Sequence, residues 1–206
     1  MGGYPADVKH RFPPAGWVFR LELLRAAPHF VVEFSAESRQ KGISVEKQVR
    51  RQKMSLAIEA FIENVNRFCE WIESGSHDIR SVRQLILALM QGVPLLQTNG
   101  LDTNGVAEYE RRGYERWQAD HKRLADLPIQ YYRIVFDPLA VDDEESVVGD
   151  VCDDLADIYG ELWHGLQAYN SGDIGYAVNH WRTSYDQHWG HHATGAIYAI
   201  DAHFRR

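Results

Sequence analysis

Apolar residues recur every three or four positions through most of this chain from residue 55 onward, a spacing typical of amphipathic α-helices. The most regular stripe consists of Leu56, Ile58, Phe61, Ile62, Val65, Phe68, Cys69 and Ile72. Similar stripes predict further helices at 79–93, 106–127, 146–169 and 174–204. Because 45% of the residues are apolar, the chain can form a sizeable core. We therefore predict an all-α bundle of about five or six helices within residues 54–206.

Two features interrupt the helical pattern. Gly190 or Gly195 is expected to kink or break the last helix. Residues 129–139 (IQYYRIVFDPL) form an extended-looking run, but a single short strand has no obvious partner. We interpret this run as a linker or turn that packs its aromatic residues into the core. These aromatic residues are Tyr131, Tyr132 and Phe136. We expect Asp142–Glu145 to precede the N-terminus of the next helix, where negative charge is favoured.

Residues 1–53 lack a comparable helical pattern and differ in charge from the rest of the chain. They hold ten Lys and Arg against five Asp and Glu (+5), whereas residues 54–206 hold twelve against twenty-four (−12), which together give the net charge of −7. We expect residues 1–53 to be a basic, poorly ordered extension ahead of a true start at Met54. The alternatives for this segment are a small β-hairpin or a partner-binding arm. Residues 44–52 could also belong to the first helix and extend it toward the N-terminus. The acidic remainder should repel phosphate backbones, so we expect the helical domain not to bind nucleic acid.

Other classes of protein are disfavoured by motifs that the chain lacks. No run of eighteen apolar residues is present, so we predict no membrane span. Cys69 and Cys152 lie far apart and form no CxxC or metal-binding spacing, which favours reduced core thiols in a cytoplasmic protein. A Walker loop, a GxGxxG dinucleotide site and a GxSxG nucleophile elbow are also missing.

Two histidines lie four residues apart on the predicted last helix. The helical spacing places His188 and His192 on its apolar side, so we expect both imidazoles to face inward. His180 and His191 fall elsewhere on the helix and are expected to be exposed. The apolar side also carries the aromatic residues Trp181, Tyr185 and Trp189.

The preceding predicted helix carries a row of acidic residues opposite its apolar stripe. Such a row is typical of a solvated helix face, and only Asp154 and Glu161 lie close enough to the stripe to turn toward a neighbouring helix. The row consists of Asp150, Asp153, Asp154, Asp157 and Glu161, together with His164.

These acids and histidines leave three interpretations open. In the first, the histidines are neutral core residues that are hydrogen-bonded by Asp154, Asp157 or tyrosine hydroxyls. In the second, they bind zinc or iron together with a carboxylate such as Asp154; in the third, they act in acid–base chemistry. Two histidines without the glutamate of the HExxH motif do not by themselves establish a metal cofactor. The aromatic residues on the same helix form either a ligand pocket or part of the core. The candidate site residues are Asp154, Asp157, Glu161, Trp181, Tyr185, His188 and His192.

Two runs in the second half of the chain match a family pattern. The run D-D-L-A-D-I-Y occupies residues 153–159, and the run W-x-x-S-aromatic-x-x-H-W-G-x-H occupies residues 181–192. Together with YYRIVFDPL, they resemble a bacterial family of small helical proteins catalogued as a domain of unknown function, number five-zero-six-three. The resemblance covers about residues 55–206 and implies a helical fold. It implies no activity, because none is established for the family.

Without a strong catalytic pattern, the sequence favours a non-catalytic interaction or regulatory protein inside the cell. Its ligand would be a protein partner or a second copy of the chain. The alternative is a hydrolase-like site between the last two long helices that depends on a metal or on histidine and carboxylate groups.

Overall fold

The computed structural model describes residues 45–75, 77–103, 108–135, 137–142 and 145–206. All of them belong to the compact unit Ser44–Arg206. The predicted N-terminal extension lies outside the described residues up to residue 44, so its predicted lack of order stays a prediction. From Val45 the chain is helical, which matches the alternative that the first helix extends backward through residues 44–52.

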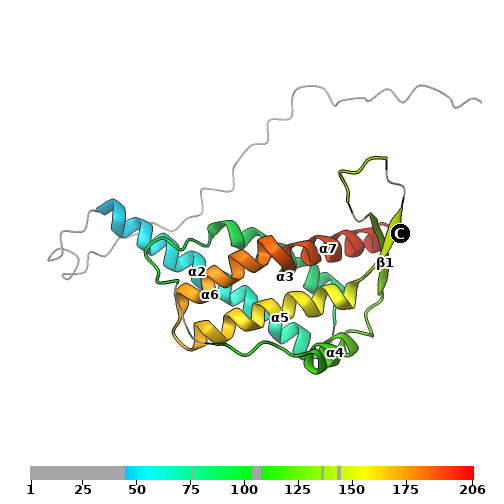
Figure 1. Ribbon diagram of the computed structural model, residues 1–206, viewed down its shortest axis with the longest axis horizontal. Helices are drawn as coiled ribbons and strands as arrows, with labels where there is room; N and C mark the ends of the chain where they lie inside the picture. The colour runs from blue at the N-terminus through cyan, green and yellow to red at the C-terminus, as the bar shows by residue number, and fades with distance from the viewer. Residues whose placement is uncertain (1–44, 76, 104–107, 136, 143–144) are drawn as a thin grey trace, which may run out of the picture. The chain divides into compact units, whose positions relative to one another are not determined.

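The protein is a helical bundle, as the apolar stripes predicted (Figure 1). The long helices are α2 (Val45–Glu73), α3 (Ile79–Gly92), α5 (Val151–Asn170), α6 (Ile174–Ser184) and α7 (Gly190–Phe204). Shorter elements are the 3₁₀ turn η1 (Val93–Leu95), α4 (Tyr114–Arg123) and the π-helical turn η2 (Tyr185–Trp189). In the described part of the chain, no helix combines the length and apolar character that a membrane span requires.

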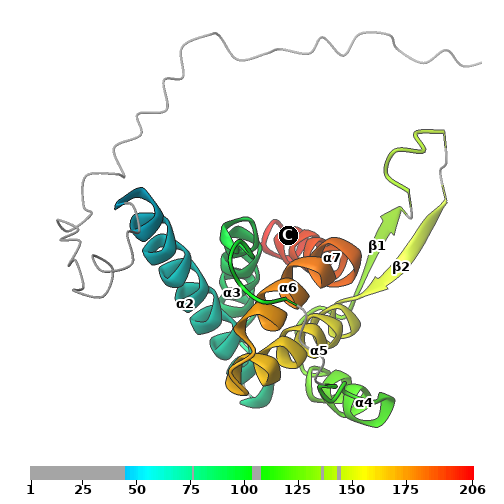
Figure 2. The same cartoon turned by 60° about the vertical axis from the view of Figure 1, so that its left-hand side comes forward.

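Helix α5 lies at the centre of the bundle, because it contacts α2, α4, α6 and α7 (Figure 2). The predicted apolar stripes meet there: Phe61 of α2 packs on Trp181 of α6 with ring centroids 5.3 Å apart. Burial of each large apolar side chain contributes about 1.5–3 kcal/mol, so the core holds the helices together without a disulfide. The largest fully buried side chains include Phe68, Ile72, Ile86, Leu89, Leu155, Ile158 and Trp189.

The two cysteines are free thiols in this core, as predicted. Burial raises the pKa of both Cys69 and Cys152 to about 12, and neighbouring negative charges add to this effect. Because the thiolate is the reactive form, both side chains act as apolar packing groups.

A β-hairpin replaces the predicted linker, and this prediction was wrong. Strand β1 (Tyr131–Val135) pairs antiparallel with β2 (Ser146–Asp150), so β1 does have a partner, which we had assigned to the beginning of the next helix. Tyr132 lies opposite Gly149, where a β-carbon would lie 2.4 Å from the tyrosine ring. Tyr131 is 67% exposed instead of buried, and Phe136 lies outside the described residues.

The hairpin also moves the N-terminus of α5 beyond the acidic segment Asp142–Glu145. The helix begins at Val151, and the Asp150 carboxylate caps it by accepting a hydrogen bond from the Cys152 backbone N–H at 2.8 Å. Asp150 therefore belongs to the helix cap and not to an acidic row within the helix.

The helix predicted for residues 106–127 is much shorter, because only Tyr114–Arg123 is helical. Residues 108–113 instead run beside α5, where the Glu110 carbonyl accepts hydrogen bonds from His164 Nδ1 at 3.1 Å and from Gln167 Nε2 at 2.8 Å. These contacts with α5 hold the segment in an irregular conformation. The predicted start at Val106 falls on residues that are not described.

Two glycines of α5 provide a matched test of the core. A β-carbon on Gly165 would lie 2.2 Å from Trp181 Nε1, whereas one on Gly160 would meet nothing within 4 Å. We expect Gly165→Ala to lower the free energy of unfolding by about 2 kcal/mol through overpacking. Gly160→Ala should raise it by up to about 1 kcal/mol, because alanine is the better helix former. Chemical denaturation measures both; equal effects would contradict this packing.

Candidate functional site

The histidines reach their positions through the π-helical turn η2, which joins α6 to α7. A β-carbon on Gly190 would lie 2.5 Å from the Tyr185 carbonyl oxygen, so glycine permits this turn. The predicted irregularity at Gly190 therefore takes the form of a π turn. A π turn holds one residue more than an α-helical turn, and this rotates the side chains that follow it around the helix axis. As a result Trp189 is fully buried, whereas the His188 side chain is 45% exposed. The predicted inward position of His188 was therefore wrong.

The acidic row of α5 is not a solvated face, and that interpretation was wrong. Asp154 is buried, and Asp153, Asp157 and Glu161 are half-buried. This side of α5 is covered because α4 and α7 pack against the helix and residues 108–113 hydrogen-bond to it. Three of the acids, Asp154, Asp157 and Glu161, face the histidines of α6, η2 and α7.

His192 is held by carboxylates on both ring nitrogens. Its Nδ1 lies 2.9 Å from Asp154 Oδ1, and its Nε2 lies 3.4 Å from Asp157 Oδ2. The other oxygen of Asp154 accepts a hydrogen bond from the Tyr132 hydroxyl at 2.8 Å. Tyr132 and Asp154 thus fix the orientation of the imidazole, while Nε2 points toward Asp157.

His188 is held in a similar way by Glu161. Its Nδ1 lies 3.1 Å from Glu161 Oε1, and the second oxygen of that carboxylate lies 3.1 Å from His180 Nε2. The rings of His188 and His192 are 4.9 Å apart between centroids. His180, which we predicted to be exposed, is therefore part of the cluster, whereas His191 is exposed as predicted.

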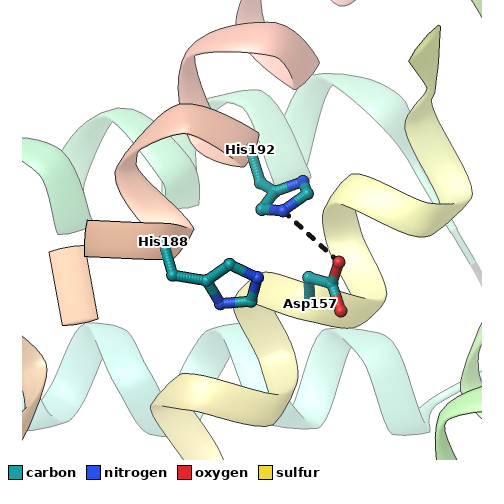
Figure 3. Close-up of side chains that lie close together, drawn as sticks. All are labelled: Asp157, His188 and His192. Atoms are coloured by element: carbon teal, nitrogen blue, oxygen red, sulfur yellow. Dashed lines mark ion pairs between the residues drawn. The ribbon is translucent and has the colours of Figure 1, made fainter. Parts of the chain in front are cut away.

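Asp157, His188 and His192 point toward one another (Figure 3). One ligating atom from each lies within 4.8 Å of the others. Trp117 Nε1 donates a hydrogen bond to Asp157 Oδ1 at 3.0 Å, which leaves Oδ2 directed toward His192. We call these three residues the His–Asp triad. Asp154, named in the sequence analysis as a possible ligand, lies behind His192 and binds its other nitrogen.

One of the three distances within the triad is that expected between two ligands of a metal ion. A tetrahedral zinc ion with bonds of about 2.0–2.1 Å separates its ligand atoms by roughly 3.3–3.4 Å. The 3.4 Å between His192 Nε2 and Asp157 Oδ2 matches this separation. Two imidazoles and one carboxylate are also a recognised donor set for iron(II).

The aromatic candidates lie in the core. Trp181 is fully buried, and its Nε1 donates a hydrogen bond to the Leu162 carbonyl at 3.1 Å. Tyr185 packs edge-on against Trp189, with centroids 4.6 Å apart. Neither residue lines the pocket beside the triad.

That pocket has a volume of about 130 Å³ and lies beside Asp157 and His188. Side chains of α5 and η2, of α4 and of the irregular segment before α4 line it. They are Arg111, Arg112, Trp117, Asp120, Ala156, Asp157, Gly160, Glu161, His164 and His188. Sequence reasoning missed the contributions of Trp117 and the two arginines, because no spacing in the chain links them to α5.

The charged groups of the cluster shift one another's pKa. Burial alone would lower the pKa of His192, but the hydrogen bond to Asp154 and the charges of Asp157, Asp154 and Asp153 together raise it above its ordinary value. Burial alone would raise the pKa of Glu161, but its bonds to His180 and His188 outweigh burial and lower the pKa to about 2. The cluster is therefore an array of ion pairs when the imidazoles are protonated.

These shifts predict how pH affects the stability of the metal-free protein. The contribution of Glu161 is complete above its ordinary pKa of 4.5 and is lost as pH falls toward about 2. The contribution of His192 is complete below its ordinary pKa of 6.5 and is lost as pH rises through the raised pKa of the folded protein. Together they favour the folded state most strongly between pH 4.5 and 6.5.

Buried His164 complicates this profile, because burial lowers its pKa and its protonation destabilises the fold at low pH. Comparison with His192→Gln isolates the contribution of His192. In EDTA, the difference in melting temperature between wild type and His192→Gln should shrink as pH rises from about 6 to about 9. A difference that is constant over this range would contradict the assignment.

Comparisons with known proteins agree with this fold. No protein with curated annotation matches the sequence. The crystal structure of protein BF1032 from Bacteroides fragilis is similar, with a TM-score of 0.57 at 15% identity over 70% of this chain and 90% of that chain. At this identity the likeness shows the fold alone. The family model described as "Domain of unknown function (DUF5063)" matches residues 52–204, and the chain therefore belongs to that family.

Proposed function

We propose that the protein binds a divalent transition-metal ion, zinc or iron(II), through Asp157, His188 and His192. The observation that carries this proposal is the convergence of one ligating atom from each residue to within 4.8 Å of the others. The geometry thus favours the alternative function from the sequence over the non-catalytic one.

The partners of the triad support this proposal. Metal-binding histidines usually donate their second ring N–H to a carboxylate or carbonyl, which fixes the ring and increases its basicity. His192 has Asp154 in this position, and His188 has Glu161. Asp157 is held through one oxygen by Trp117, so each member of the triad keeps one atom for the ion.

We further propose that the ion supports hydrolysis in the neighbouring pocket. With three protein ligands, a zinc ion keeps a fourth position for water, whose pKa falls to about 7. After losing a proton to solvent, this water would add as hydroxide to the carbon or phosphorus of an ester. The bond to the leaving oxygen would then break, and that oxygen would take up a proton. Asp157 and His188 line the pocket, so the open position would face it.

Metal content and thermal stability test the proposal. Protein purified without chelator should contain about one zinc or iron per chain by elemental mass spectrometry. After EDTA treatment, adding zinc at about a hundred times its Kd should stabilise the fold by about 2.7 kcal/mol, whereas magnesium should have little effect because it prefers oxygen ligands. Absence of bound metal together with no zinc-induced shift would refute the proposal.

A protein-interaction role is the second candidate, and the hairpin favours it. Leu139 and Val141, in the connection between β1 and β2, are 85% and 89% exposed, and both outer edges of the two-stranded sheet lack a neighbour among the described strands. Open edges and exposed apolar side chains favour pairing with a second copy. Analytical ultracentrifugation should then show a dimer, and the double substitution Leu139→Ser/Val141→Ser should dissociate this dimer. A wild-type protein that is monomeric at all concentrations would exclude self-association through the hairpin.

Both candidate functions fit the predicted cytoplasmic location, which stays a prediction.

A further inference from the structure

The pocket beside the His–Asp triad is lined by two arginines and three carboxylates, and two of these carboxylates form ion pairs within the cluster. Asp120 lies between two guanidinium groups, with Arg112 Nη2 at 2.6 Å and Arg123 Nη1 at 3.1 Å. Glu161 is similarly shared by two imidazoles. These two carboxylates are therefore already paired.

Arg111 lines the same pocket and is exposed. Within the described ranges, no carboxylate forms an ion pair with it; its neighbour Arg112, in contrast, is bound to Asp120 and lies over the Tyr159 ring at 4.6 Å. With a divalent ion on Asp157, two centres of unbalanced positive charge would face one cavity. An anionic ligand suits this arrangement.

Gly160 leaves the floor of this pocket open. Glycine in the middle of a helix is destabilising, and close packing often explains its presence. Packing does not explain Gly160, because a β-carbon there would meet nothing within 4 Å. Its missing side chain instead adds space between Asp157 and Glu161, next to His188.

The pocket is small. Its volume of about 130 Å³ is close to that of an engineered cavity of about 150 Å³ that accommodates benzene. It can enclose one compact group, while the rest of a larger ligand would remain outside.

We infer that this pocket binds the oxyanion group of a small ligand, a phosphate or a carboxylate, between the metal ion of the His–Asp triad and Arg111. The inference rests on the proposed function, because the ion would supply one of the two positive centres. It also specifies the substrate class of that function: esters that carry, or release, such an anionic group.

Calorimetric titration of the zinc-loaded full-length protein tests this inference, with inorganic phosphate and acetate as separate probes. Arg111→Gln should weaken binding of the preferred anion about tenfold, which corresponds to the loss of one charge-assisted hydrogen bond. Gly160→Leu should abolish binding by filling the pocket. The control Arg116→Gln, which lies outside the pocket, should bind nearly as wild type. Stronger binding of phosphate than of acetate would identify phosphate esters, and the reverse would identify carboxylates.

Separate zinc titrations distinguish failure of this inference from failure of the proposed function. If all variants bind zinc equally but neither anion binds, or anion binding is insensitive to Gly160→Leu, the pocket inference is wrong and the metal site stands. If wild type does not bind zinc, the metal site is wrong. The pocket inference then fails with it, because the ion is one of the two positive centres on which the inference rests.

Discussion

Replacing His188 by alanine should weaken zinc binding at least about a hundredfold. Loss of a partner behind a ligand typically costs 10–100-fold in affinity, so loss of a ligand itself should cost at least as much. The same substitution should hardly change the stability of the metal-free protein. His188 is 45% exposed, and an ion pair this close to solvent contributes about 0–1 kcal/mol.

His191→Ala is the matched control, because His191 is exposed and lies outside the triad. Competitive titration against a chelator of known affinity should find nearly wild-type zinc binding in this variant. If His188→Ala and His191→Ala bind zinc equally well, His188 is not a ligand. A large loss of stability in metal-free His188→Ala would instead identify a structural role.

Replacing Asp154 by alanine should lower the free energy of unfolding by about 3 kcal/mol, which corresponds to a decrease in melting temperature of roughly 6–12 °C. Asp154 is buried and binds both the Tyr132 hydroxyl and His192 Nδ1. Its removal leaves these two groups without their partner in a covered interface, and the loss of a buried partner is costly.

Asp153→Ala is the control for this experiment. Asp153 is the adjacent residue and is half-buried, but its carboxylate makes no hydrogen bond with any part of the chain that is described. Burial raises the pKa of Asp153, and the negative charges of Asp157, Asp154 and Asp150 add to this, which outweighs the opposing effect of His192. Its removal should therefore leave stability unchanged or slightly increased. If the two alanine variants unfold at the same temperature, Asp154 does not hold the helices together.

The helices were predictable because each one buries a stripe that is visible in the sequence. Residues with helical spacing in α2, such as Phe61, Val65 and Phe68, are all buried. The hairpin was not predictable by this route. Val147 and Val148 precede Val151 at spacings that suit a helix, and only the folded chain brings them beside β1. The covering of the acidic face of α5 likewise depends on contacts that are distant in sequence.

The candidate site was predicted in part. The pairing of His192 with Asp154 follows from two regular helices, but the position of His180 does not. Eight residues separate His180 from His188, which in an ideal α-helix places them about 80° apart. One extra residue in the π turn reduces the effective separation to seven, about 20° from alignment, so both reach Glu161. Gly190 predicted an irregularity at this point of the chain, but not that it would be a π turn.

Anomalous diffraction at the zinc absorption edge, from crystals of the zinc-loaded protein, tests the metal site most directly. We predict one strong peak about 2.0–2.2 Å from Asp157 Oδ2 and from one nitrogen each of His188 and His192, with Asp154 still bound to the other nitrogen of His192. A map without a peak between these residues, with His192 still bridging Asp154 and Asp157, would contradict it.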